Sequence, residues 1–154
     1  MMEEIVPKKE VPALPSGIWI QYANREFNTS KKTQIKNISE TGVANIVEKV
    51  QDGTYRSLFL CPDDCGEEGF LLLESSEDLI CLQIYDASEE ITWSCFDPAY
   101  LDSNEEAPIE CSDGQSIIEM RNTMKDRELA AKCVEWYIHT GEPYPGMDWL
   151  KLIQ

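Results

Sequence analysis

The sequence predicts an α+β fold, with a single, mostly antiparallel β-sheet, a helix before it and a longer C-terminal helix packed on one face. Its 154 residues, 42% of them hydrophobic, suit one ordinary domain with a real core. Four short apolar runs at even spacing, with short polar connections, predict an antiparallel meander. Two stretches with helical apolar spacing flank these runs. No apolar run approaches the roughly 18–20 residues of a membrane-spanning helix.

The first part of the chain combines a proline-rich arm with a predicted strand. Residues 1–16 carry three of the eight prolines, which predicts an extended or disordered arm before a domain of residues 17–154. Residues 17–22 are apolar and aromatic and predict a first strand. Residues 24–37 are polar and basic, so we expect either a loop or an irregular pair of short strands there.

A helix is predicted over residues 40–51. Ser39 is a suitable N-cap, and Asp52-Gly53 ends the pattern. The apolar side chains recur at the helical spacing i, i+3, i+4 and i+7, namely Val43, Ile46, Val47 and Val50.

The meander follows this helix. Its runs are residues 55–61, 69–73, 79–85 and 91–96. Side chains alternate between the two faces of a strand, so Ile80, Leu82 and Ile84 share one wholly apolar face. We predict that this face lies against the core.

The remaining residues contain a long loop and the second helix. Residues 97–114 predict the loop, and residues 115–119, with Ile117 and Ile118, predict a short strand. Thr123 is the expected cap of a helix over 124–140, supported by Asp126 and ended by Gly141. Residues 147–150 predict an extended tail anchored by Trp149. The apolar stripe of the helix consists of Ala130, Cys133, Val134 and Tyr137.

Negative charge is concentrated in the middle of the chain. The formal net charge is −16, and residues 57–120 hold 17 acidic residues with no Lys, Arg or His. The other 12 acidic residues are balanced by all 13 basic ones. Such a surface repels nucleic acid and anionic membranes, which excludes binders of either. The charge either serves solubility alone or suits a basic protein partner.

The six cysteines are expected to be free thiols. A domain of this size needs no disulfides, and the N-terminus, with acids before bases and no apolar region, does not resemble a secretory signal. Cys61 and Cys65 have a zinc-like spacing, but a second ligand pair is missing. We therefore predict a cytoplasmic protein without metal or other cofactor.

The chain lacks the usual signatures of catalysis. Its one histidine, His139, lies near the predicted helix end, where it complements the helix dipole. Phosphate-binding glycine patterns and hydrolase motifs are absent. We expect a protein that is not an enzyme, with a thiol enzyme using Cys65 or Cys95 as the weaker alternative.

Aromatic residues near acidic ones are candidate contacts for a basic partner. Trp93 follows one acidic turn, and Tyr100 lies in the long acidic loop. Alternation with Ile91 and Cys95 also allows Trp93 to be a core residue. The predicted partner-binding residues are Asp86, Glu89, Glu90, Trp93, Tyr100, Asp102, Glu105 and Glu106.

The C-terminal third carries a family resemblance. Residues 123–150 read TMKDRELAAKCVEWYIHTGEPYPGMDWL, a helix with paired aromatics, a Gly/Pro turn and a final Trp. With the preceding meander, residues 40–152 resemble the Imm-one family of immunity proteins from bacterial polymorphic toxin and contact-dependent inhibition systems. The resemblance implies a non-enzymatic, cytoplasmic inhibitor of a cognate toxin, often a nucleic-acid deaminase or nuclease. Its matched residues Trp136, Tyr137 and Trp149 are structural.

The sequence therefore predicts an immunity protein that covers the basic active-site cleft of a toxin. The alternative is a small acidic adaptor for another basic protein. Genomic position separates these hypotheses, because an immunity gene is expected directly downstream of a large modular toxin gene.

Overall fold

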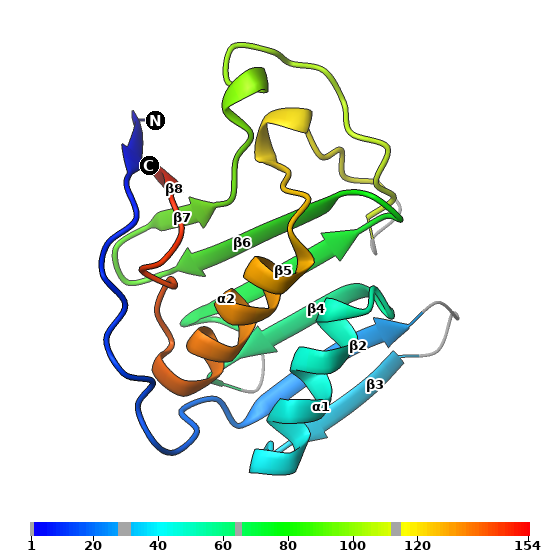
Figure 1. Cartoon of the computed structure of the whole chain (residues 1–154), viewed down its shortest axis with the longest axis vertical. Helices are drawn as coiled ribbons and strands as arrows, with labels where there is room; N and C mark the ends of the chain where they lie inside the picture. The colour runs from blue at the N-terminus through cyan, green and yellow to red at the C-terminus, as the bar shows by residue number, and fades with distance from the viewer. Residues whose placement is uncertain (1, 28–31, 64–65, 112–114) are drawn as a thin grey trace.

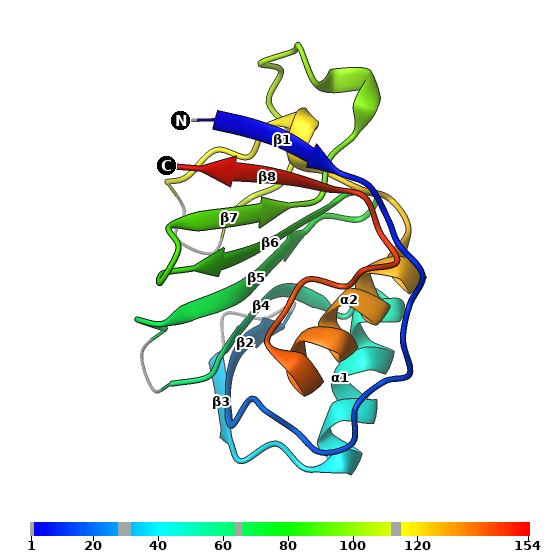
Figure 2. The same cartoon turned by 90° about the vertical axis from the view of Figure 1, so that its left-hand side faces the viewer.

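Eight antiparallel strands form one sheet, in the order β1-β8-β7-β6-β5-β4-β2-β3, in the residues that the structure describes. The structure is a computed structural model and describes residues 2–27, 32–63, 66–111 and 115–154. Helices α1 (Glu40–Gln51) and α2 (Arg127–Thr140) lie on the same face of the sheet (Figures 1 and 2). The predicted α+β class is confirmed.

The central meander matches the prediction closely. Its strands are β4 (Tyr55–Cys61), β5 (Gly69–Ser75), β6 (Ile80–Asp86) and β7 (Ile91–Ser94). Cross-strand register places Leu58, Leu73 and Leu82 in one row and Leu60, Leu71 and Ile84 in the next. The predicted core face of β6 is buried, because both rows lie under the helices.

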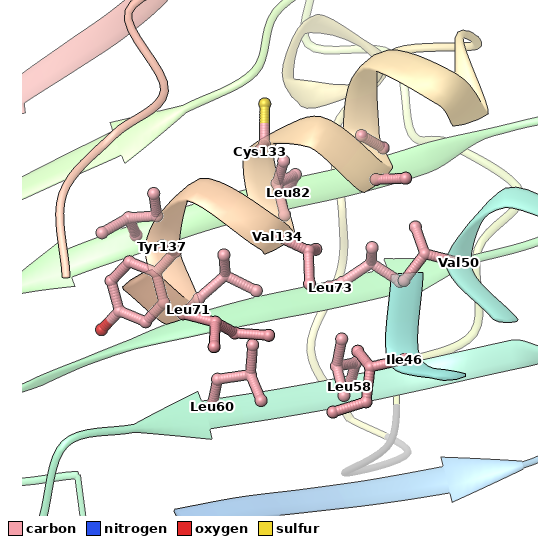
Figure 3. Close-up of a cluster of buried hydrophobic side chains, with 14 of the residues drawn as sticks. Ile46, Val50, Leu58, Leu60, Leu71, Leu73, Leu82, Cys133, Val134 and Tyr137 are labelled. Atoms are coloured by element: carbon pink, nitrogen blue, oxygen red, sulfur yellow. The ribbon is translucent and has the colours of Figure 1, made fainter. Parts of the chain in front are cut away.

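The core fills the space between this sheet and the helices. Figure 3 shows Ile46 and Val50 of α1 and Val134 and Tyr137 of α2 directed at the leucines of β4, β5 and β6. The predicted stripe of α2 is buried throughout. A smaller apolar cluster, around Cys81 and Ile118, lies on the opposite face of the sheet under the long loop.

The first predicted strand is wrong. Residues 17–21 form no strand; β2 is Tyr22–Phe27, and it pairs with β3 (Lys32–Lys36) and with β4. The backbone N–H groups of Trp19 and Ile20 instead donate to the carbonyl of Ile138 in α2. This contact with a distant helix explains the buried apolar character of Ile20. Of the two alternatives for residues 24–37, the pair of strands is confirmed.

The two ends of the chain complete one edge of the sheet. β1 (Met2–Val6) pairs with β8 (Trp149–Ile153), which also pairs with β7. Within the predicted arm, residues 2–6 belong to the sheet, whereas the chain from residue 7 to residue 21 forms no helix or strand. The predicted extended tail runs directly into β8. Both termini lie side by side in Figure 2.

Capping residues set the helix ends. Ser39 accepts a hydrogen bond from the N–H of Gly42 at 3.0 Å, so the predicted cap of α1 is confirmed. Asp126, and not Thr123, caps α2 by accepting from the N–H of Leu129 at 3.1 Å. Thr123 is buried, and its hydroxyl donates to the Met120 carbonyl. Gly141, at φ 72°, ends α2 as predicted.

The predicted strand over residues 115–119 is also wrong. Glu119 forms only an isolated bridge with Glu106, and residues 115–118 form no strand. Ile118 lies in the smaller apolar cluster, whereas Ile117 is exposed. Two backbone hydrogen bonds, from the N–H of Ala107 to the Ile118 carbonyl and from the N–H of Met120 to the Glu105 carbonyl, hold this segment together with the buried Ile118 side chain. Among the described residues, no helix has the length and apolar character needed to span a membrane.

Candidate functional site

A cleft of about 860 Å³ lies at one end of the sheet. Four segments far apart in sequence surround it: the N-terminal arm, the β4–β5 connection, the β6–β7 turn and the chain that follows α2. This end is on the left in Figure 1, where the arm passes the tip of α2 and the β6–β7 turn. Charged and aromatic residues in its lining include Lys9, Trp19, Glu67, Glu68, Asp86, Glu89, Trp93, Tyr137, Glu142 and Tyr144.

The β6–β7 turn forms the acidic side of the cleft. Asp86, at the end of β6, accepts hydrogen bonds from the N–H and hydroxyl of Ser88 at 3.0 and 2.7 Å. The N–H of Ala87 donates to the Glu68 carbonyl at 3.2 Å, which ties this turn to the β4–β5 connection. Glu67 and Glu89 are exposed. Two acidic loops therefore lie next to each other.

The chain after α2 forms the aromatic side. The Tyr144 ring packs against Trp136 with centroids 6.0 Å apart, and the Tyr144 carbonyl accepts from Trp149 Nε1 at 2.8 Å. Trp19 stands against Gly141 and is 49% exposed. A Cβ at Gly141 would lie 2.5 Å from the Trp19 ring, so glycine is needed both for its φ and for this close contact.

The arm is fastened to this chain by backbone hydrogen bonds. The N–H of Lys9 donates to the Pro145 carbonyl at 2.7 Å, and the N–H of Lys8 donates to Asp148 Oδ1 at 2.7 Å. Pro145 and Asp148 lie just before β8, which pairs with β1. The arm therefore forms a wall of the cleft.

The electrostatic potential of the cleft is negative. Its lining includes five carboxylates, from Glu67, Glu68, Asp86, Glu89 and Glu142, and Lys9 is the single base among the described residues that line it. Tyr137 forms the inner wall, and Figure 3 shows its hydroxyl directed away from the core leucines. Burial, together with nearby groups that include Asp63 and Asp86, raises the pKa of Tyr137, so its hydroxyl stays protonated.

The eight predicted partner-binding residues divide into two groups. Asp86, Glu89 and Trp93 line the cleft, and Glu90 is exposed in the same turn. The other four lie beyond the far end of β7, on the loop at the top of Figure 1; these are Tyr100, Asp102, Glu105 and Glu106. The structure therefore does not gather the eight residues into one site. Binding by either group stays a prediction.

The loop over residues 97–111, the far loop, is nevertheless an ordered element. Asp97 caps the 3₁₀ turn η1 (Pro98–Tyr100), and the Glu105 carbonyl accepts from the N–H of Met120 at the start of η2 (Met120–Asn122). Tyr100 is partly buried there, whereas Asp102, Glu105 and Glu106 are exposed. This loop presents acids on a surface that is separate from the cleft.

The sequence left open whether Trp93 is a core residue or a partner contact, and the structure places it between the core and the cleft. Its ring packs at the margin of the core and also lines the cleft. Lys151, its direct partner on β8, places Nζ 5.1 Å from the ring centroid of Trp93. The ring face thus accepts a cation from the same chain.

Several cleft residues were missed by sequence reasoning. The sequence predicts a strand at Trp19, and it predicts only the end of a helix at the Gly-Glu-Pro-Tyr-Pro turn after α2. Glu67 and Glu68 fall in the predicted connection between residues 55–61 and 69–73, with no predicted binding role. Tyr144, which lies between Pro143 and Pro145, was the available signal in the sequence.

Within the described ranges, Cys81, Cys95 and Cys133 are free thiols; Cys65 lies outside those ranges. Cys61, Cys81, Cys95 and Cys133 are buried, and Cys111 is partly exposed. Burial raises the pKa of Cys95 to about 12 and raises the pKa values of Cys81 and Cys133 as well. In the described part of the chain, no three His, Cys, Asp or Glu side chains are placed to hold a metal ion.

A thiol-labelling experiment tests the cysteine prediction. In the native protein at neutral pH we expect Cys111 to react before the four buried thiols, because buried, protonated thiols are poor nucleophiles. The four buried thiols should react only after unfolding. Denatured, non-reduced protein should show six free thiols and no stoichiometric zinc; four missing thiols or one zinc per chain would contradict this.

These features define an α+β protein with a two-layer arrangement and an acidic, aromatic cleft at one end of its sheet. Comparison with protein-family models, with curated proteins and with solved structures found no match. The resemblance of residues 40–152 to immunity proteins therefore stays a prediction.

Proposed function

We propose that this chain is a non-enzymatic binding protein for a basic protein partner, and that it acts in the cytoplasm as an immunity protein against a toxin. The observation that carries the proposal is the cleft, in which five carboxylates and exposed aromatic surface meet in one concave site. Aromatic side chains are preferred anchors of protein interfaces, and charge complementarity selects the partner.

The distribution of charge supports a basic partner. Residues 57–120 supply four of the five cleft carboxylates and the acids of the far loop. One-signed surfaces accelerate association with partners of opposite charge. A toxin that acts on nucleic acid needs a basic, phosphate-attracting cleft, and an acidic protein bound over that cleft blocks its substrate.

The position of His139 supports a binding role over catalysis. It lies in the last turn of α2, where a basic side chain complements the helix dipole. Cys95, the alternative nucleophile within the described residues, is buried with a raised pKa, opposite to the activation that a catalytic thiol needs.

Co-purification tests the function directly. The chain should be co-expressed with the C-terminal domain of the protein encoded immediately upstream of its gene. A stable complex that suppresses the toxicity of this domain supports the immunity function. A complex with a basic partner that is not toxic would instead support the acidic adaptor, the second candidate from the sequence.

Two double variants assign binding to one of the two acidic surfaces. Glu89→Gln/Glu90→Gln changes the turn beside the cleft, and Glu105→Gln/Glu106→Gln makes the same charge change on the far loop. We expect the first variant to slow association about threefold to tenfold at low salt and to flatten the salt dependence of the association rate. The reason is that acidic side chains near an interface act by steering the diffusional encounter with a basic partner.

The far-loop variant serves as the matched control, and its association rate should change less than about twofold. Both variants should keep the unfolding midpoint, because exposed charges contribute little to stability. Stopped-flow association across a salt series measures the effect. A larger effect of the far-loop variant would place the interface there.

A further inference from the structure

We propose that the cleft receives arginine or lysine side chains from an extended basic segment of the partner. This inference rests on the proposed function in taking the ligand to be a protein, and it adds the place and mode of recognition. Trp19 supplies the ring face, and Glu67, Glu68 and Glu142 supply the carboxylates around it.

The shape of the cleft favours a segment over a flat surface. Its volume of about 860 Å³ lies within the range of about 300–1,000 Å³ seen for pockets that hold small ligands. The walls come from separate segments that backbone hydrogen bonds hold together: Lys9 to Pro145, and Ala87 to Glu68. A few side chains of a protruding segment fit such a space, whereas a globular face does not enter it.

The carboxylates that line the cleft favour a positively charged ligand. Glu67, Glu68 and Glu142 are exposed, so their carboxylates contact water. An apolar segment would desolvate these groups without replacing their interactions with water, at a cost in free energy. Guanidinium and ammonium groups are the side chains that compensate such carboxylates.

The aromatic rings favour a cation that can also stack. Trp19 is half exposed. Its ring contacts Gly141, and its backbone N–H donates a hydrogen bond to the Ile138 carbonyl, so its position is set. A ring fixed in this way presents its surface without a large ordering cost. The Lys151 ammonium over Trp93 shows that a tryptophan lining this cleft already accepts a cation. Arginine stacks on such rings more often than lysine does.

Other cations fit the cleft less well. In the described residues, no three potential ligands converge on a point where a metal ion could bind. A solvated set of separated carboxylates suits a group with several N–H donors spread over a plane. Arginine has this geometry, with five donors in a fixed fork.

Capped pentapeptides provide the probe. The first alternates glycine and arginine, the second replaces arginine by lysine, and the third replaces it by citrulline, which has the shape of arginine without its charge. Binding to the full chain is measured by calorimetry at low salt, with tryptophan fluorescence as a second readout. We expect the arginine peptide to bind at least about fivefold more tightly than the citrulline peptide.

Matched triple variants locate this binding. Glu67→Gln/Glu68→Gln/Glu142→Gln should weaken arginine-peptide binding at least about tenfold. The control Asp102→Asn/Glu105→Gln/Glu106→Gln makes the same charge change on the far loop and should weaken it less than about twofold. Trp19→Ala, which keeps every charge, should weaken it about two- to fivefold. The unfolding midpoints of all variants establish that they are folded.

Equal weakening by the two triple variants would overturn the inference, because binding would then follow only the net charge. Equal binding of the citrulline peptide would overturn it as well. If the toxin domain co-purifies with the cleft variant as strongly as with the original chain, this inference fails while the proposed function stands. If the arginine peptide binds at the cleft and no basic partner is found, the proposed function fails and the cleft assignment holds.

Discussion

Replacement of Trp149 by alanine is expected to lower the free energy of unfolding by about 3–5 kcal/mol. Trp149 opens β8, is 2% exposed and belongs to the main core cluster. Its indole N–H donates to the Tyr144 carbonyl, and its backbone lies opposite Val6 of β1. The truncation therefore leaves a cavity, removes a hydrogen bond and loosens the strand that holds the chain terminus.

Denaturant unfolding followed by circular dichroism measures this effect, and two further variants define its origin. Trp149→Phe restores most of the volume without the N–H and should lose less stability than alanine. Trp19→Ala removes a half-exposed tryptophan and should lower stability by less than half as much, because less apolar surface leaves water on folding. Unchanged stability in Trp149→Ala with loss of partner binding would make Trp149 an interface residue and contradict its structural role.

Gly69→Ala is expected to lower the free energy of unfolding by about 2–4 kcal/mol. Gly69 begins β5 at φ 152°, a conformation that other residues rarely adopt, and it pairs with Asp86. An added Cβ would lie 2.5 Å from the backbone carbonyl oxygen of Tyr85. Backbone cannot rotate away as a side chain can, so the start of β5 or the end of β6 must move.

Gly17→Ala is the control for this prediction. Gly17 also has a positive φ, at 86°, but an added Cβ there meets no atom within 4 Å. Its substitution should therefore lower the free energy of unfolding only by the cost of placing alanine at a positive φ, about 1 kcal/mol. Thermal and denaturant unfolding compare the two variants. An equal loss of stability in both would show that the close approach to Tyr85 is relieved without cost.

Gly69→Ala should also affect the cleft. Gly69 and Asp86 both line it, and the Glu68 carbonyl binds the turn that follows β6. A shift of these strands would separate the two acidic loops. The variant should therefore bind the arginine peptide less tightly, even at temperatures where it remains folded.

Local patterns determined the centre of this fold. The helical spacing of Val43, Ile46 and Val50 and the cap at Ser39 were sufficient for α1, and alternation in β6 identified its core face. Gly141 marked the end of α2 for a local reason, since the left-handed conformation there suits glycine. In each case the decisive interaction joins residues within a few positions of one another, so the sequence alone displays it.

Tertiary contacts decided the outer strands and the cleft. β1 is a strand because β8, at the other end of the chain, offers it an unpaired edge. α2 begins at Arg127 with Asp126 as its cap, because Met124 is held in a bridge with Ile80 of β6 and does not join the helix. Asp86, Glu89 and Trp93 were found from local composition, but Trp19, Glu67 and Glu142 join them only when four separate segments meet. Sequence by itself determined the negative charge, the central elements and the candidate acids. Where those charges form a concave site depends on long-range pairing, which no local pattern records.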